Sequence, residues 1–232
     1  MDDTLNVIEK RLEQDQFTQH VVVNVAKLVN MHDDAQLRES VESCDIINID
    51  GTGVVWGGRF LGYDIPERVA GIDLFYRLVG LAQHKKLGVY LLGARKEVVE
   101  EAVQALKQQY PELDISGYHH GYFWEDEKSV VDDIRNSGAK LLFIAITSPK
   151  KENFINKWKD RLGVSFVMGV GGTFDVVAGV VSRAPKWMQK FGLEWLYRLL
   201  QEPRRLWKRY LVTNSKFAWW LLKAKLKLGK QK

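Results

Sequence analysis

Residues 140–177 read KLLFIAITSPKKENFINKWKDRLGVSFVMGVGGTFDVV, and this stretch decides the fold class. Its two short apolar runs, Lys140–Ile146 and Val164–Met168, have the length and the β-branched and aromatic composition of buried strands. The segment between them, Lys151–Arg161, has a helical pattern. A strand, a helix and a second strand in this order are typical of a parallel sheet that helices cover on both faces.

The same alternation continues through most of the chain. Further strands are expected near His20–Asn24, Asp45–Asp50, Gly88–Leu92 and Asp114–Gly117, and further helices near Asp33–Ser43, Ile72–His84, Lys96–Tyr110 and Glu127–Ser137. We also expect an antiparallel hairpin of Val54–Trp56 and Arg59–Leu61 that turns at Gly57-Gly58. The predicted fold class is therefore α/β, with a mostly parallel sheet and helices on both of its faces.

Charge divides the chain into two parts. The formal net charge is +5, but residues 196–232 hold 11 Lys and Arg and only one acid, Glu202. Residues 1–195 hold the remaining 23 bases and 28 acids, so this part is mildly acidic. We therefore predict an α/β body over residues 1–195 and a basic, amphipathic helical appendage over residues 196–232. Such asymmetry indicates a polyanionic partner for the appendage, either an anionic membrane or a nucleic acid.

The appendage interleaves aromatic and basic side chains. Trp207, Tyr210, Phe217 and Trp220 lie on apolar helical faces between lysines and arginines. Basic amphipathic helices with tryptophan at the boundary lie in membrane interfaces, where each basic residue contributes ~1 kcal/mol near an anionic surface. Nucleic-acid binding is the first alternative, because bases stack on aromatic rings, and a helix packed on the body with a solvated basic face is the second. The aromatic content is high for a solvated helix, so we expect an anionic membrane surface as partner and no nucleic acid.

The N-terminal residues and the single cysteine bear on location. Met1-Asp2-Asp3-Thr4 is acidic where a secretory leader would be basic. No apolar stretch reaches the ~18 residues that a spanning helix needs. One cysteine, Cys44, fits a reducing compartment. We expect a cytoplasmic body and a protein that is peripheral on the inner face of the cell membrane.

Asp50 is the first candidate for chemistry. It follows the apolar residues Ile46, Ile47 and Ile49, so it stands at the carboxyl end of a predicted strand, and Gly51 follows it. Ligands of open α/β sheets bind beyond such strand ends, and glycine lets the backbone approach a ligand closely. A carboxylate in this position can accept a proton from an attacking hydroxyl. A plain turn is the alternative interpretation, because Asp-Gly is a common turn pair.

Three further features contain candidate phosphate ligands. Arg68 could bind phosphate as a bidentate donor if it lies near Asp50, and otherwise it is a solvated residue at a helix entry. The run Gly169–Asp175 follows a strand and precedes an apolar helix start, which is the context of a phosphate-binding turn. A tight strand-to-helix turn explains this run equally well. Gly93 ends another predicted strand and is a weaker signal of the same kind.

Several other function classes lack support. The glycine run is not a dinucleotide fingerprint, because the last glycine of that motif would fall at Phe174, and the run lacks the lysine of a P-loop. His119 and His120 are adjacent rather than spaced along one helical face, and the sequence has no Asp-x-Asp and no recognisable nucleophile signature. We therefore expect no metal and no cofactor. Ser148, before Pro149, is expected to cap a helix.

Taken in this order, the clusters resemble the WecG/TagA/CpsF glycosyltransferases, family 26 of the sugar-transferase classification. The resemblance covers roughly Val21 to Tyr210, and the ordered set is specific although each motif alone is weak. The matching residues are Asn24, Asn48–Gly53, Pro66–Val69, Gly71–Asp73, Leu91–Gly93, His119–Phe123, Ser148–Glu152, Gly169–Asp175, Ala178-Gly179, Arg183–Pro185, Gly192–Arg198 and Glu202–Arg205.

The resemblance implies a Rossmann-like body that transfers a hexose or N-acetylhexosamine-type sugar, with inversion, from a UDP-sugar donor. The implied acceptor is a polyprenyl-diphosphate-linked sugar, and the product feeds a cell-surface polysaccharide. By motif position, Asp50 would be the general base, Asn24 would line its pocket, and Arg68 would steady the diphosphate as charge builds on the leaving UDP. The resemblance also implies two sets of ligand contacts. The residues expected to contact the nucleotide are Gly51, Gly93, Lys151, Gly171, Gly172, Phe174 and Asp175. The residues expected to contact the acceptor or its diphosphate are Arg198, Arg205 and Arg209.

Two positions depart from the family pattern. Lys151 stands where relatives usually carry glutamine, which adds a cation beside the expected site, and Val22 stands where some relatives carry threonine. A non-catalytic module that binds a membrane or nucleic acid through the tail is the alternative function. A Rossmann oxidoreductase is a distant third. The identity of the sugar, the acceptor hydroxyl and the oligomeric state, including a possible homo-oligomer, stay open at this point.

Overall fold

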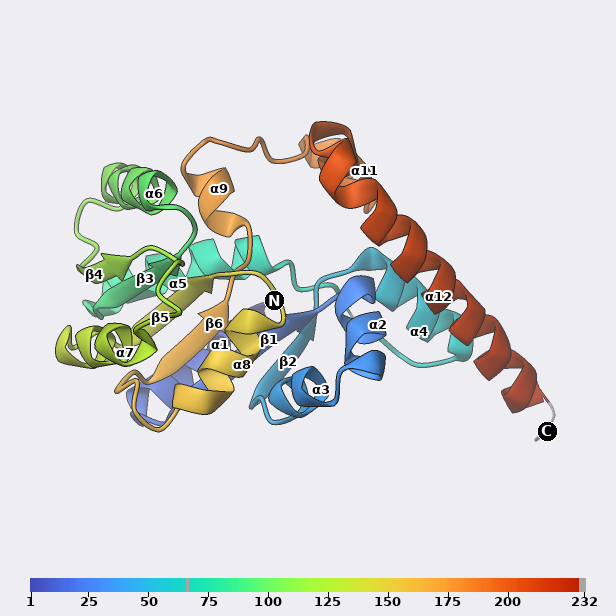
Figure 1. Ribbon diagram of the computed structural model, residues 1–232, viewed down its shortest axis with the longest axis horizontal. Helices are drawn as coiled ribbons and strands as arrows, with labels where there is room; N and C mark the ends of the chain where they lie inside the picture. Colours follow the sequence, from blue (N-terminus) through green and yellow to red (C-terminus); the bar gives the residue numbers. More distant parts are fainter. Residues whose placement is uncertain (66, 230–232) are drawn as a thin grey trace.

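The protein is built on one six-stranded, all-parallel sheet. The computed structural model describes residues 1–65 and 67–229 (Figure 1), so Pro66 of the Pro66–Val69 motif and the last three residues of the tail lie outside it. The strands are β1 (Thr18–Val23), β2 (Ile46–Ile49), β3 (Val89–Gly93), β4 (Ile115–His119), β5 (Leu141–Ala145) and β6 (Phe166–Gly169). Their order in the sheet is β2-β1-β6-β5-β3-β4. This confirms the predicted α/β class and the Rossmann-like parallel arrangement.

Helices precede, follow or connect these strands. They are α1 (Asp2–Glu13), α2 (Val25–Asp33), α3 (Ala35–Glu42), α4 (Thr52–Leu61), α5 (Gly71–Lys85), α6 (Lys96–Gln109), α7 (Glu127–Asn136), α8 (Lys150–Trp158), α9 (Thr173–Val177), α10 (Lys186–Lys190), α11 (Glu194–Gln201) and α12 (Pro203–Gly229). The predicted strands, and the predicted helices of the body, are found within a few residues of their expected bounds.

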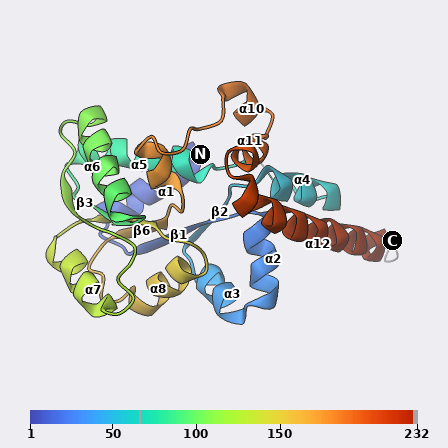
Figure 2. The ribbon, with the colours of Figure 1, turned by 45° about the horizontal axis from the view of Figure 1, so that its top comes forward.

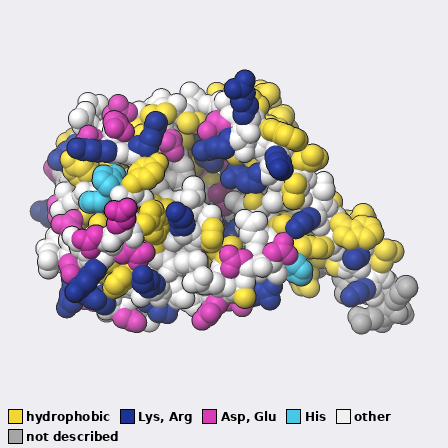
Figure 3. All heavy atoms as spheres, viewed as in Figure 1, with side chains coloured by type: hydrophobic (Ala, Val, Ile, Leu, Met, Phe, Trp, Pro, Cys, Tyr) yellow, Lys and Arg dark blue, Asp and Glu magenta, His cyan; other side chains and the backbone are white. Residues whose placement is uncertain are grey.

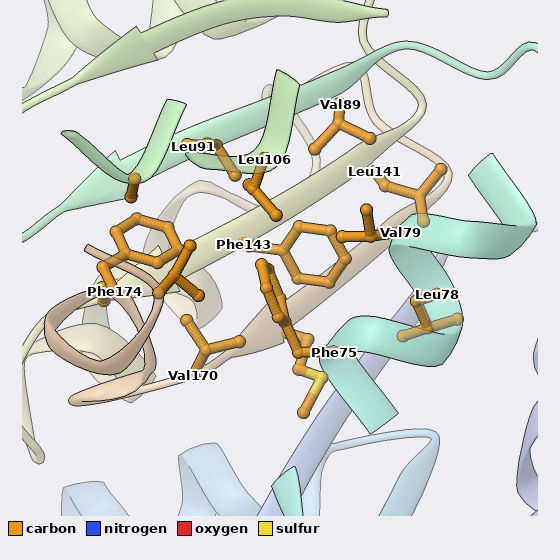
Figure 4. Close-up of a cluster of buried hydrophobic side chains, with 14 of the residues drawn as sticks. Phe75, Leu78, Val79, Val89, Leu91, Leu106, Leu141, Phe143, Val170 and Phe174 are labelled. Atoms are coloured by element: carbon orange, nitrogen blue, oxygen red, sulfur yellow. The ribbon is translucent and has the colours of Figure 1, made fainter. Parts of the chain in front are cut away.

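Alternate side chains of each inner strand enter two different cores. On β3, Leu91 packs with residues of α1, α5 and α6, including Phe75, in a core that Figure 4 shows. Tyr90 and Leu92, which point the other way, pack with α7 and α8. A smaller core joins Val21 and Val23 of β1 to α3. Burial on both faces explains the almost unbroken apolar runs of these strands.

The predicted hairpin at Gly57-Gly58 is wrong, because this segment is helix α4. A side chain at Gly57 would place its Cβ 2.8 Å from Cζ of Phe217 in α12, and one at Gly58 would collide with Ile65. The two glycines therefore make room for side chains packed on the helix and do not form a turn. Packing against α12 stabilises helical structure where local preference favours a turn.

Three helices and one cap also differ from expectation. Helices α1, α2 and α10 were not predicted, although Ile8 of α1 is fully buried. Ser148 does not cap α8: the residue before this helix is Pro149, the Ser148-Pro149 peptide bond is cis, and the buried Ser148 hydroxyl has no hydrogen-bond partner.

The C-terminal appendage is helical, as predicted. The expected division between residues 195 and 196 falls inside α11, and α12 packs on α11, α2 and α4. Figures 1 and 2 show α12 running past α2 and α4 and then projecting beyond the body. Within the described ranges, no helix combines the length and the apolar character needed to cross a bilayer.

Candidate active site

Asn24 and Asp50 lie side by side at the carboxyl edge of the sheet. They follow the paired residues Val23 of β1 and Ile49 of β2. The Asn24 side chain accepts a hydrogen bond from the backbone N–H of Lys27 at 3.0 Å, so it caps α2. A Cβ on Gly51 would lie 3.1 Å from Cβ of Asn24, so glycine is what allows the two strand ends to approach closely.

The Asp50 carboxyl lies in an environment that favours its protonated form. Burial raises the pKa of this carboxyl above its ordinary value, and the Arg68 guanidinium opposes that rise. The Glu194 carboxylate adds to the rise in pKa, whereas Arg198 and a hydrogen bond from the Gly71 backbone N–H oppose it. A carboxylate with a raised pKa is a better proton acceptor than an ordinary aspartate, which suits a general base.

A chain of ion pairs connects the region beside Asp50 to the start of the tail. Nη2 of Arg68 lies 2.7 Å from Oε2 of Glu194 on α11. The other Glu194 oxygen, Oε1, lies 3.6 Å from Nε of Arg183. Arg183 also makes a bidentate pair with Asp73 on α5, at 2.6 and 2.8 Å. This network attaches α11 to the body at the site.

Glu194 is a site residue to which the sequence analysis gave no role. It lies inside the matched run Gly192–Arg198, and that membership was the only available signal. Its position between Arg68 and Arg183 depends on how the tail folds back, which local spacing does not reveal. Arg198 lies near these ion pairs, because it lines a small pocket together with Arg183, Glu194 and Ile72.

The other two tail arginines make contacts within the tail. Arg205 pairs with Glu202, and its side chain is 70% exposed. The guanidinium of Arg209 lies over the ring of Tyr210, 5.2 Å from its centre. In this structure the charge of Arg198 acts on the Asp50 carboxyl, whereas Arg205 and Arg209 are on the first turns of α12 and are exposed.

The predicted nucleotide turn has the expected backbone form. It follows β6, Gly171 has a left-handed φ of +55°, and Gly172 precedes the first residue of α9. The expected nucleotide contact of Phe174 needs correction for its side chain, because that side chain is fully buried in the core against Phe75. Only the backbone of Phe174 remains as a possible contact for a nucleotide.

Gly93 lies at the end of β3 in a conformation that requires glycine. Its φ is +125°, and a Cβ there would come within 2.5 Å of the backbone oxygen of Ala145. Gly121, from the His119–Phe123 motif, packs closely against the Gly93 backbone. The motif residues at the ends of β3 and β4 are therefore in contact with each other. They lie far from Asp50, because β2 is at the opposite edge of the sheet from β4.

Lys151 is buried in an ion cluster. Its Nζ lies 2.9 Å from Oε1 of Glu152, and Nζ of Lys27 lies 2.8 Å from the same oxygen. Burial lowers the pKa of Lys151, and Glu152 opposes this effect. The cation that distinguishes this chain from the family pattern is thus held by Glu152 under the carboxyl edge of the sheet, beside Gly169.

Lysines and arginines border a hollow on the face shown in Figure 3. The hollow lies between the body and α11, and the basic side chains gather along α11 and α12. Among residues 1–65 and 67–229, no three His, Cys, Asp or Glu side chains come together as a set of metal ligands. An anionic ligand in this hollow would meet Lys and Arg side chains.

An open parallel sheet with a carboxylate and arginines at its carboxyl edge defines a Rossmann-like α/β protein whose candidate site combines an acidic side chain with basic ones. The sequence model of the glycosyl transferase WecG/TagA/CpsF family matches residues 1–231, so the chain belongs to this family.

Two curated relatives carry the same name, N-acetylglucosaminyldiphosphoundecaprenol N-acetyl-beta-D-mannosaminyltransferase. The protein from Bacillus spizizenii is 40% identical over 171 residues, which cover 74% of this chain and 66% of the relative. The protein from Bacillus subtilis strain 168 is 37% identical over 183 residues, which cover 79% of this chain and 70% of the relative. The matched part thus spans about two thirds of the length of each relative.

Proposed function

We propose that the chain transfers an N-acetylhexosamine-type sugar from a UDP-sugar to the sugar of a polyprenyl-diphosphate-linked acceptor. The observation that carries this proposal is the Asp50 carboxyl, which lies at a strand end in a member of this family, where the charges of Arg68 and Arg198 both act on it. The relatives' name describes transfer of N-acetylmannosamine to N-acetylglucosaminyldiphosphoundecaprenol. These two sugars are therefore the first donor and acceptor to test.

The proposed reaction is a single inverting displacement. Asp50 accepts the proton of the acceptor hydroxyl, and the hydroxyl oxygen forms a bond to the anomeric carbon of the donor sugar. The bond from that carbon to the UDP oxygen breaks, and its electron pair leaves with UDP. A base with a raised pKa suits the proton transfer from the acceptor hydroxyl, because it holds the proton more tightly as the oxygen attacks.

Arg68 and Arg198 are the proposed partners of the leaving diphosphate. Guanidinium groups bind phosphate oxygens in bidentate geometry, and fixed cations stabilise charge as it develops. Glu194 holds Arg68 at 2.7 Å, so this guanidinium is in position before the donor binds. With arginines in this role, we propose a reaction that needs no divalent metal.

Association with a membrane surface is the second part of the proposal. A polyprenyl-linked acceptor stays in the bilayer, so the enzyme has to work at its surface. Helix α12 carries eight Lys and Arg and no acid, together with exposed tryptophan and leucine side chains. We propose that the tail holds the protein on the anionic inner face of the cell membrane.

The proposed base is tested with Asp50→Asn and, as a control, Asp64→Asn, which changes an exposed aspartate outside the site. Both are assayed in EDTA with UDP-N-acetylmannosamine and N-acetylglucosaminyl diphospholipid. We expect Asp50→Asn to lower kcat by about 10²–10⁴-fold with unchanged melting temperature, and the control to match wild type. Near-wild-type turnover by a folded Asp50→Asn protein would remove Asp50 from the mechanism.

A further inference from the structure

Helix α4 carries exposed aromatic side chains on the side away from its packed face. Trp56 is 60% exposed and Phe60 is 47% exposed, and Tyr63, just beyond the helix, is 65% exposed. The four-residue spacing of Trp56 and Phe60 places these two on one face of the helix. Tyr63 follows the helix end at Gly62, and Val54, Val55 and Gly57 are the buried residues of α4. Two exposed aromatic groups on one short helix and a third directly after it are more than scattered surface residues.

Helix α12 carries an apolar stripe of its own, opposite the face with which it packs on the body. Its buried and half-buried residues include Leu206, Tyr210, Thr213 and Phe217. The exposed stripe consists of Trp207, Leu211, Leu222 and Leu226. Trp207 and Leu211 are one helical turn apart, as are Leu222 and Leu226, and three turns separate the two pairs. Figure 3 shows hydrophobic side chains gathered along α11 and α12 with basic ones between them.

The two helices are packed together, so their exposed faces belong to one part of the molecule. Phe217 and Leu221 of α12 lie against Gly57 of α4. Nζ of Lys225 donates a hydrogen bond to the backbone oxygen of Phe60 at 2.8 Å and lies 5.2 Å from the centre of its ring. The exposed aromatic group of α4 is therefore fixed beside a basic turn of α12.

We propose that α4 of the body, together with α12, forms one surface that inserts into an anionic lipid bilayer. This inference rests on the proposed function and adds to it, because it brings a second element, α4 of the body, into contact with the bilayer. Trp56 and Phe60 of α4 and Tyr63 after it enter the interface, and the stripe on α12 enters beside them. Large aromatic side chains partition into this interfacial region.

Charge favours a lipid surface over a second copy of the chain. Helix α12 has eight basic residues and no acidic one, so two copies that met through it would bring like charges together. Anionic head groups instead offset these charges, at ~1 kcal/mol for each basic residue near the surface. Lys223 lies over the ring of Trp219, which places a cation beside an exposed aromatic side chain as well.

This surface would set the position of the reaction. Helix α4 begins at Thr52, two residues after Asp50. At 1.5 Å per helical residue, Trp56 is only about 6 Å and Phe60 about 12 Å along the helix from its first residue, Thr52. Inserted aromatic residues would thus hold the proposed base next to the head-group region, where the diphosphate and sugar of a lipid-linked acceptor lie.

The test compares the double variant Trp56→Ser/Phe60→Ser with Val7→Ser/Tyr118→Ser. Val7 on α1 and Tyr118 on β4 are also about half exposed, and Figure 1 shows β4 at the edge of the sheet away from α12. Binding to vesicles of phosphatidylglycerol and phosphatidylcholine is measured by sedimentation. We expect the first variant to bind at least about tenfold more weakly and the second to bind as wild type.

Activity and association separate the possible outcomes. The α4 variant should lose turnover on a long-chain acceptor in vesicles and keep it on a water-soluble, short-chain N-acetylglucosaminyl diphosphate. The conservative variant Trp56→Phe should retain vesicle binding. Unchanged vesicle binding of the α4 variant would overturn the inference, and so would a change confined to self-association in analytical ultracentrifugation. Transfer to the soluble acceptor by wild type is measured in the same series and tests the proposed function separately.

Discussion

At the scale of single residues, Glu194 connects Asp50, the proposed base, to the cations around it. It contacts Arg68 and Arg183, and its charge contributes to the raised pKa of Asp50. The positive charge of Arg68 is therefore balanced by the Glu194 carboxylate before any substrate is present. A negative charge placed here both positions a guanidinium and strengthens a base, so its removal should change both the stability and the pH dependence of the enzyme.

Glu194→Gln tests this position. The acidic limb of the kcat/KM profile should move to lower pH, because the pKa of Asp50 is no longer raised by a neighbouring carboxylate. The free energy of unfolding should fall by about 1–2 kcal/mol, since two arginines lose a charged partner. Asp160→Asn, at an exposed residue, serves as control. A purely structural role would lower stability and leave the pH profile unmoved.

His20 makes the stability of the fold depend on pH. Burial lowers its pKa to about 4, which the hydrogen bond to Asn48 only partly opposes. The unfolded chain takes up a proton near pH 6.5, whereas the folded protein does so only near pH 4, so stability is lost as pH falls through this window. The loss should approach about 3 kcal/mol by pH 4.

Urea unfolding of wild type and His20→Gln between pH 7 and pH 4.5 measures this contribution. Carboxylates also titrate in this range, so the difference between the two proteins isolates the histidine. The variant should lose less stability on acidification. Equal slopes for both proteins would mean that the His20 ring is protonated inside the fold.

At the scale of elements, two-sided burial made the sheet predictable and tertiary packing limited the rest. The strands β3 and β5 are apolar on both faces, so their sequences are unmistakable. Helix α4 was mistaken for a hairpin because Gly57 and Gly58 are a good turn pair locally. Only the packing of Phe217 and Ile65 against them explains why glycine is there.

The candidate site also has residues that the sequence predicts and contacts that only the tertiary structure reveals. The sequence placed Asp50 and Gly51 at a predicted strand end, and the family resemblance named Asn24. Asn24 and Asp50 are neighbours because adjacent parallel strands bring their carboxyl ends together. The contact of Glu194 with Arg68 joins segments that are far apart in sequence, so no local spacing predicts it. Phe174 was assigned to the nucleotide from its motif, but alternation of core and surface on a short helix directs its side chain inward.

At the scale of the whole molecule, α12 is proposed to serve chemistry at one end and anchoring along its length. Arg205 and Arg209 lie on its first turns, next to α11 and its Arg198. Lys223 and Lys227 have the same four-residue spacing five turns later, and so occupy the same face of the helix about 27 Å away. The two pairs are matched in charge and geometry and differ in their distance from Asp50.

Arg205→Gln/Arg209→Gln should therefore lower kcat/KM on the soluble short-chain acceptor by at least about tenfold, because the variant removes two guanidinium groups that we propose bind the diphosphate when the acceptor is present. Lys223→Gln/Lys227→Gln should leave that activity unchanged and weaken binding to anionic vesicles, with the stronger effect at low ionic strength. Each double variant is measured in both assays. If the arginine pair affects only vesicle binding, as the lysine pair does, α12 is an anchor along its whole length and Arg198 is the tail's contribution to the diphosphate site.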